Sequence, residues 1–268
     1  MSWGFWAIEL SAYLFFLFAL VEGFRESLRW GMTVISAALT GLLIELMFVH
    51  LAGGYEYGRF AVMLGDAPVW VACGWAFILY YSMKASETLP IKSWSMPIAA
   101  ALMATGLDLT LDIVAEGQGW WHWKREEADF FGVSYDNFIG WLMIVGCFAG
   151  FSKLFVHLWG EDQRWKQIVF PLLVIPASTV VVGGAQFLWE ALYRVFGEGP
   201  VFLVLYVALQ ILVMPGKRLA VRMLIPRYFL GLLFIIAVAG GVTEIHPEVY
   251  GVFALSLTAS LFWFKEES

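Results

Sequence analysis

Two aspartates four residues apart, Asp108 and Asp112, stand near the end of an otherwise apolar stretch. Residues with this spacing share one face of a helix, so the two carboxyl groups are expected to lie side by side. Two close carboxylates repel each other, and apolar surroundings disfavour their charge further. We therefore expect one of them to stay protonated near neutral pH beside an ionised partner. Paired carboxyls of this kind divide acid and base roles in catalysis.

Other polar side chains interrupt apolar stretches at a corresponding depth. Carboxylates inside a bilayer are costly and usually face the interior of a helix bundle, so each is a candidate functional residue. Gln186 and Glu190 are again four apart and share a face, whereas Glu45 and His50 are five apart and do not. For Glu9 and His50 we prefer the simpler interpretation, a residue near the interface that reaches water. For Glu190 and the aspartate pair both interpretations stay open.

The elements that must position these residues are transmembrane helices. Hydrophobic residues make up 61% of the 268 residues and charged residues 14%, against about 45–50% and about 25% in soluble domains. The composition predicts an all-α, polytopic transmembrane helix bundle that forms a single membrane domain over residues 1–268. Stretches of about 20 apolar residues can cross a bilayer. They predict about nine spans (seven to nine), near residues 3–22, 31–51, 68–86, 94–115, 136–159, 169–193, 200–214, 227–242 and 249–264.

Basic residues alternate between the predicted loops. One set of loops is rich in lysine and arginine, and its strongest member is the segment 215–227, which carries four basic residues and no acidic one. Because cytoplasmic loops carry the excess of basic residues, this set is expected to be cytoplasmic. The N-terminus is then outside and the C-terminus cytoplasmic, and the candidate carboxyls lie in the outer half. The expected location is the cytoplasmic (inner) membrane of a prokaryote.

Several chemistries lack their usual residues. Four histidines are too few for the clustered motifs of a membrane di-iron enzyme, and no Cys/His arrangement has zinc spacing. Neither a phosphate-binding nor a dinucleotide-binding glycine motif occurs, nor does a serine nucleophile elbow. The remaining expectation is a reaction on a lipophilic substrate that carboxyl groups drive, with no cofactor and no metal. Membrane lipids are expected partners and nucleic acid is not; membrane protein partners or a homo-oligomer are compatible with the sequence.

The loop after the aspartates is aromatic. The tryptophans of the segment 120–123, "WWHW", are typical of an interfacial belt. Alternatively, their rings line the mouth of an apolar cavity, where aromatic faces stabilise a cation. Asn137 is expected near the start of the next helix, where asparagine commonly serves as a cap. Gly132 and Gly140 are expected to allow a turn and close helix packing.

Two segments resemble the membrane carotenoid hydratases, a family that includes carotenoid 1,2-hydratases and bisanhydrobacterioruberin hydratases. The first is "IELMFVHLAGGYEYGRFAVMLGDAPVWVACGW", residues 44–75. It is similar to the family's stretch with a glutamate in the second helix, a Gly-x-Tyr-x-Tyr-like loop and a tryptophan in the next helix. The second, residues 108–141, resembles the family's Asp-x-x-x-Asp, Gly-x-Trp-x-Trp, Phe-Gly-Val and Asn-Phe-x-Gly-Trp. Ile113 and Ser134 stand where the family usually has proline, which identifies a divergent member.

The resemblance implies water addition to the terminal double bond of a linear, lycopene-like carotenoid end. It assigns Asp108 or Asp112 as the acid, the other aspartate to the water or the cation, and Glu45 as an additional or alternative donor. The polyene or isoprenoid substrate would be bound by further residues that the motifs and the predicted depth single out: Tyr55, Tyr57, Trp121, Trp123, Asn137, Trp141 and Glu190.

Two other functions stay open. A non-catalytic carotenoid- or lipid-binding subunit of a membrane complex would use the acids structurally, paired with Arg59 or Arg125. A membrane prenyltransferase would hold magnesium and a diphosphate on the Asp-x-x-x-Asp motif. It requires a second aspartate-rich motif, which the sequence lacks, and it requires the aspartates on the cytoplasmic side. A proton-coupled transporter is less favoured, because no repeat symmetry is evident.

Overall fold

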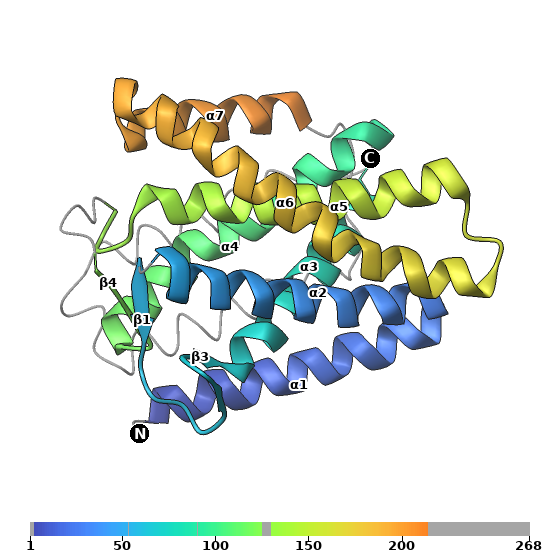
Figure 1. Ribbon diagram of the computed structural model, residues 1–268, viewed down its shortest axis with the longest axis horizontal. Helices are drawn as coiled ribbons and strands as arrows, with labels where there is room; N and C mark the ends of the chain where they lie inside the picture. The colour runs from blue at the N-terminus through green and yellow to red at the C-terminus, as the bar shows by residue number, and fades with distance from the viewer. Residues whose placement is uncertain (1–2, 53, 90, 125–129, 214–268) are drawn as a thin grey trace, which may run out of the picture.

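The structure is a computed structural model that describes residues 3–52, 54–89, 91–124 and 130–213. It is mostly helical, with short strands at one end (Figure 1). The elements in chain order are α1 (Trp3–Glu26), α2 (Leu28–Met47), a π-helical turn (Phe48–Ala52), β1 (Tyr55–Tyr57), β2 (Met63–Leu64), β3 (Ala67–Pro68), α3 (Val69–Glu87), a 3₁₀ turn (Ser93–Ser95), α4 (Met96–Gln118), β4 (Trp121–Trp123), α5 (Tyr135–Trp159), α6 (Arg164–Phe196) and α7 (Glu198–Val213).

The helices match the first seven predicted spans in order and position. Within the described residues, five helices are long and apolar enough to cross a membrane: Trp3–Glu26, Leu28–His50, Ser93–Gln118, Tyr135–Trp159 and Arg164–Phe196. Helix α6 includes Pro171 and Pro176 and begins at Arg164, before both prolines. The predicted spans 227–242 and 249–264, and the basic segment 215–227, lie outside the described residues.

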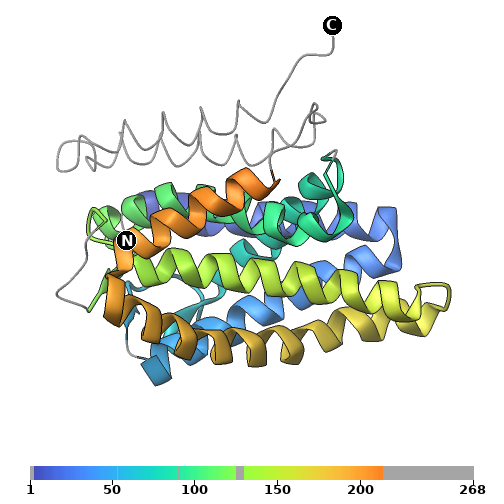
Figure 2. The same ribbon diagram turned by 90° about the horizontal axis from the view of Figure 1, so that it is seen from above.

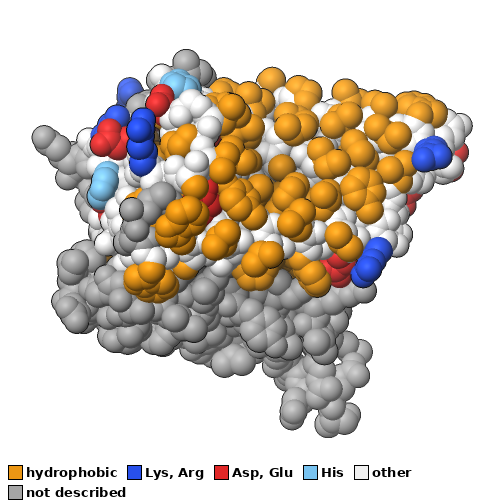
Figure 3. Space-filling model, turned by 90° about the horizontal axis from the view of Figure 1, so that it is seen from below, with side chains coloured by type: hydrophobic (Ala, Val, Ile, Leu, Met, Phe, Trp, Pro, Cys, Tyr) orange, Lys and Arg blue, Asp and Glu red, His pale blue; other side chains and the backbone are white. Residues whose placement is uncertain are grey.

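The outer surface has the distribution of side chains that a membrane requires. Seen from the side of α1, apolar side chains cover the middle of the molecule, and charged side chains gather towards its two ends (Figure 3). Most exposed residues of α1 are large and apolar, among them Leu10, Leu14, Leu17, Phe18 and Val21. Because such a surface would be unfavourable in water, it supports an integral membrane protein.

Helix α3 occupies the centre of the bundle. Most of its residues are buried, and it packs against α1, α2 and α4. Helices α5 and α6 lie side by side, and α6 also packs on α2 (Figure 2). Successive helices alternate in direction, so the end of α2, the end of α4 and the start of α5 come together at the end of the bundle where β1 and β4 lie (Figure 1).

The strands at this end differ from the purely helical prediction. Strand β1 pairs antiparallel with β4, with Tyr55 opposite Trp123 and Tyr57 opposite Trp121. Strands β2 and β3 form a second short antiparallel pair. Gly119 ends α4 in the left-handed conformation, at φ +68°, which glycine adopts without a steric penalty. The turn directs the chain into β4, and Gly58 N–H donates to the Trp120 carbonyl at 2.8 Å.

Glu9 anchors the loop that follows β1. Its side chain is buried, and its carboxylate accepts hydrogen bonds from the backbone N–H groups of Ala61 and Val62, both at 3.0 Å. The Tyr13 hydroxyl donates a third hydrogen bond at 2.9 Å. The preferred interpretation of Glu9 as a residue that reaches interfacial water is therefore wrong: it holds the loop against α1.

The first prediction concerns this anchor. The substitution Glu9→Gln replaces one acceptor oxygen by an NH₂ group that faces a backbone N–H, so we expect a loss of about 1–3 kcal/mol of stability. Thermal unfolding of the detergent-solubilised protein measures the loss. Glu56→Gln is the matched control, because Glu56 is exposed on β1, and its expected effect is within about 0.5 kcal/mol. Equal unfolding temperatures for the two variants would contradict the anchoring role.

Candidate active site

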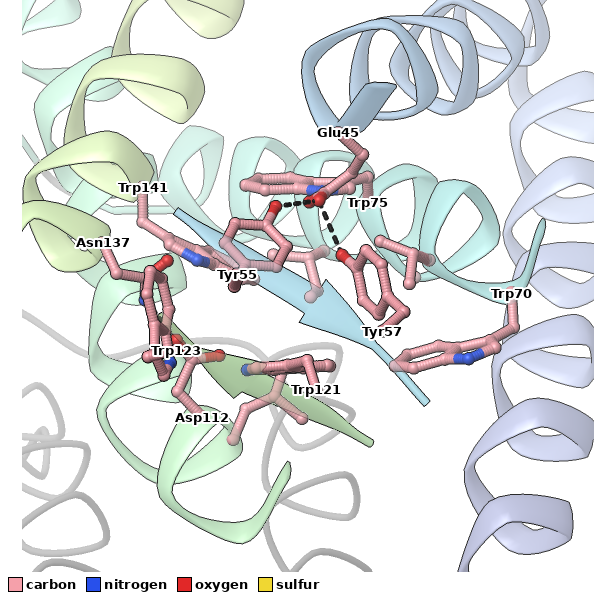
Figure 4. Close-up of a pocket in the computed structure, with 14 residues that line it drawn as sticks. Glu45, Tyr55, Tyr57, Trp70, Trp75, Asp112, Trp121, Trp123, Asn137 and Trp141 are labelled. Atoms are coloured by element: carbon pink, nitrogen blue, oxygen red, sulfur yellow. Dashed lines mark hydrogen bonds between the residues drawn. The ribbon is translucent and has the colours of Figure 1, made fainter. Parts of the chain in front are cut away.

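A cavity of about 50 Å³ opens at the end of the bundle where β1 and β4 lie. It has room for a few water molecules or for the tip of a larger apolar ligand. Four helices and both strands of the β1–β4 pair contribute to its wall (Figure 4). The lining residues are Glu45, Tyr55, Tyr57, Trp70, Val71, Gly74, Trp75, Ile78, Leu111, Asp112, Trp121, Trp123, Asn137 and Trp141.

Asp108 and Asp112 share one hydrogen-bond donor. Both side chains are buried, and the Asn137 amide donates to an oxygen of each, at 2.7 Å to Asp108 Oδ2 and to Asp112 Oδ2 as well. Asp112 lines the cavity, whereas Asp108 lies behind it on α4. The second Asp108 oxygen, Oδ1, is buried without a hydrogen-bond partner among the described residues. The expected shared face is therefore present, and it points to the interior of the bundle.

Asn137 does not cap its helix. Ser134 is the N-cap of α5, and its hydroxyl accepts from the Asp136 N–H. Asn137 lies within the first turn, where its side chain is free to reach α4. The capping interpretation of Asn137 is wrong, and its position between two carboxyls is the alternative that the structure supports.

Glu45 lies across the cavity from Asp112, and aromatic rings occupy the space between them (Figure 4). Its carboxylate accepts hydrogen bonds from three side chains: the Tyr55 hydroxyl, the Tyr57 hydroxyl at 2.6 Å and Trp75 Nε1 at 2.8 Å. Both oxygens are used as acceptors, so the donors suit a carboxylate rather than a carboxylic acid. Glu45 is thus a fixed acceptor, while the aspartate pair has one amide donor for two carboxyls.

The short strands explain how four aromatic side chains reach the cavity. Side chains along a strand alternate between its faces. Tyr55, Tyr57, Trp121 and Trp123 therefore project together into the cavity, while the paired residues Glu56 and His122 are exposed. Tyr55 packs against Trp123 with ring centroids 5.0 Å apart, and Tyr57 against Trp121 at 5.7 Å. The tryptophans thus line a cavity, as the second interpretation of the aromatic loop proposed.

A glycine on α2 makes room for the Trp75 ring. A Cβ atom at Gly41 would lie 2.3 Å from Trp75 Cβ, which real structures do not allow. The Trp75 indole therefore packs on Gly41 and reaches Glu45, one helical turn further along α2. Its other face stacks on Trp141 of α5, with centroids 4.3 Å apart. This contact ties α2, α3 and α5 together around the cavity.

Burial and the negative charge of Glu45 raise the pKa of both Tyr55 and Tyr57 well above the ordinary value of tyrosine. Burial is the largest cause for each phenol. Both hydroxyls therefore stay neutral hydrogen-bond donors to Glu45 across the physiological range.

The second prediction follows from these raised pKa values. A pKa that is higher in the folded than in the unfolded protein contributes stability that is complete below the unfolded value, about 10, and that is lost as the pH rises through the folded value. The Tyr55→Phe/Tyr57→Phe double variant should therefore release as many tyrosine protons as the unchanged protein up to about pH 10. Ultraviolet absorbance of tyrosinate measures the release. About one proton fewer from the variant in that range, half a proton for each ordinary phenol, would contradict the burial of the phenols.

Four other residues that the sequence singled out lie outside the cavity wall. Glu190 is not part of the cavity wall: its side chain is 38% exposed and forms an ion pair with Arg194 at 3.6 Å. The prediction that Glu190 binds substrate has no geometric support. His50 is exposed beside Asp66, which agrees with the interfacial interpretation. Gly132 has φ +89° in a turn, as expected, but an added Cβ at Gly140 would contact nothing within 4 Å, so close helix packing does not explain that glycine.

Sequence reasoning missed two tryptophans and a glycine in the wall. Trp70 stacks on Trp121 with centroids 6.1 Å apart, and Trp75 binds Glu45 directly. Trp75 was visible in the matched segment as the tryptophan after Gly74, in the same Gly-Trp order as Gly140 and Trp141. That repetition was the available signal, although it does not by itself show that the two rings stack.

Comparison with protein families decides the classification. The family described as carotenoid biosynthesis protein matches residues 4–206, which is most of the chain and includes every cavity residue. The chain belongs to this family. Neither the curated proteins nor the solved structures give a significant match. Family membership supports a role in carotenoid biosynthesis and suggests a lipophilic isoprenoid substrate. Together with the apolar helices it indicates a membrane protein.

Proposed function

We propose that this family member adds water to the terminal double bond of a linear, lycopene-like carotenoid. The single observation that carries the proposal is the cavity in which Asp112, backed by Asp108, faces Glu45 across a wall of aromatic rings. The cavity volume of about 50 Å³ is far too small for a whole carotenoid. Only the end of the polyene would enter, and the rest would remain in the lipid.

Asp112 is the proposed proton donor. A trisubstituted alkene is a weak base, so its protonation requires a carboxylic acid held in place in a site with little water. Asp108 and Asp112 are bridged by one Asn137 amide, and two ionised carboxylates there would repel each other. One shared proton relieves the repulsion. Asp112 delivers it because Asp112 lines the cavity. The Asn137 amide, which donates to both carboxyls, and the nearby cation stabilise the two carboxylates that are left.

The proton adds to the alkene carbon that bears hydrogen, and the neighbouring carbon becomes a tertiary cation. Trp121 and Trp123 line the space where this cation would form, and aromatic faces attract cations. Glu45 contributes negative charge from the opposite side. A water molecule then attacks the cation, and its surplus proton returns to the aspartate pair. One water is consumed and the carboxyl groups are restored.

Pigment analysis in a lycopene-producing host tests the proposal. Expression of the protein should give pigments heavier than lycopene by one water for each hydrated end, and cells with an empty vector should not make them. The terminal double bond is not conjugated with the polyene, so the visible spectrum should stay unchanged while the mass rises. Unmodified lycopene that co-purifies with the protein would instead indicate a carotenoid-binding subunit without this activity.

A further inference from the structure

Gly74 leaves a hollow in the cavity wall that no feature of the fold requires. It lies within α3 (Val69–Glu87), among regular helical residues, and a Cβ atom added there would meet nothing within 4 Å. Glycine is one of the least favourable residues in a helix interior. Glycines in membrane helices usually allow close packing of a neighbouring helix, and Gly41 does so for the Trp75 ring. Gly74 contacts no such neighbour in the part of the chain that the structure describes.

The position of Gly74 places this hollow among the reacting groups. The α3 residues of the wall are Trp70, Val71, Gly74, Trp75 and Ile78, which share one helix face. All except Gly74 carry large side chains, so the wall is deepest at its middle. The neighbouring surfaces of Val71 and Ile78 are apolar, so the hollow suits hydrocarbon rather than water.

Gly140 repeats the arrangement on the facing helix. It is buried on α5, and a Cβ added there would also meet nothing within 4 Å. Trp75 and Trp141, the residues that follow the two glycines, stack on each other at 4.3 Å. Two Gly-Trp pairs on α3 and α5 therefore combine a rigid aromatic contact with unfilled space beside it.

From these observations we infer that Gly74 determines the size of the isoprenoid end group that the cavity accepts. The space beside Gly74 receives the methyl-bearing terminus of the polyene, and any side chain at this position takes part of that space. The inference rests on the proposed function for the identity of the ligand. It assigns Gly74 a role in admitting the substrate and none in proton transfer.

The test is a graded series, Gly74→Ala, Gly74→Val and Gly74→Leu. The measured quantities are the lycopene retained per mole of detergent-purified protein, the yield of hydrated pigment and the unfolding temperature. Gly184→Leu is the matched control, because Gly184 is exposed on α6 and its added Cβ also meets nothing within 4 Å. We expect Gly74→Ala to unfold no lower than the unchanged protein, since alanine favours a helix and clashes with nothing.

Lycopene retention should fall in the order Gly, Ala, Val, Leu, and the leucine variant should retain about tenfold less or lower still. The control should retain as much as the unchanged protein. Equal retention across the series at equal unfolding temperature would overturn the inference; if the leucine variant unfolds, the alanine and valine variants decide. Falling retention without any hydrated product would support the inference and refute the hydratase function. Hydrated product together with equal retention in all variants would support the hydratase function and refute the role of Gly74.

Discussion

Replacing Asp112 by asparagine is expected to lower the yield of hydrated lycopene by a factor of about 10² to 10⁴, the usual contribution of a positioned general acid. The substitution keeps the size of the side chain and removes the carboxyl that lines the cavity. Asp108→Asn should also reduce the yield strongly, because Asp108 shares the Asn137 amide and the proton with Asp112. The measurement is the ratio of hydrated pigment to lycopene, per mole of protein in the membrane.

Asp66→Asn is the control for this pair. Asp66 lies 72% exposed beside His50 and outside the cavity, so its substitution should leave the yield unchanged. Full hydration by the Asp112→Asn variant, with the protein present at normal amounts, would show that Asp112 is not the proton donor. Full hydration by Asp108→Asn alone would leave Asp112 as the donor but would end the argument for a shared proton.

The substitution of Glu45 should have the second largest effect, and it should affect both stability and activity. Glu45→Gln places an NH₂ group against hydroxyl or indole donors, so at least one buried donor loses its acceptor. Such a loss costs about 1–3 kcal/mol. Hydration should fall by about tenfold or more, since the charge that faces the cation is removed, and a tenfold loss corresponds to about 1.4 kcal/mol. Thermal unfolding and pigment yield measure the two effects separately.

A double-mutant cycle shows whether Glu45 acts through its tyrosine partners. Residues in direct contact show interaction energies of about 0.5–3 kcal/mol, whereas separate sites are additive. The losses of stability from Glu45→Ala and Tyr57→Phe should therefore not add, because each substitution removes the 2.6 Å hydrogen bond. Glu56→Gln serves again as the exposed control. Additive losses, or a Glu45→Gln variant as stable and active as the unchanged protein, would contradict the role of Glu45 as a fixed acceptor.

Hydropathy predicted the first seven helices because burial in a membrane requires long apolar segments whatever their packing. The short strands were missed, although Tyr-x-Tyr and Trp-x-Trp have the alternation of a strand. Three residues are too few to distinguish a strand from a loop without the partner strand, and β1 and β4 lie far apart in the sequence. The aspartate pair was predictable because the spacing along a helix fixes its shared face.

The contacts that complete the site could not be inferred from local patterns. Asn137 has the position of a capping residue in the sequence, and only the packing of α5 on α4 brings it between the aspartates. Glu190 has the spacing of a site residue, yet the side chain is paired with Arg194 outside the cavity. In both cases the rotation of one helix against another decides the outcome, and that rotation depends on contacts between distant segments.

The most direct measurement of the central claim uses purified protein and lycopene in heavy-oxygen water, followed by mass analysis of the extracted pigment. A hydratase takes the hydroxyl oxygen from solvent, so each hydrated end should carry one heavy oxygen atom, and the Asp112→Asn variant should yield almost none of this product. An alcohol with oxygen of normal mass, or lycopene recovered unchanged from active preparations, would contradict the proposed addition of water.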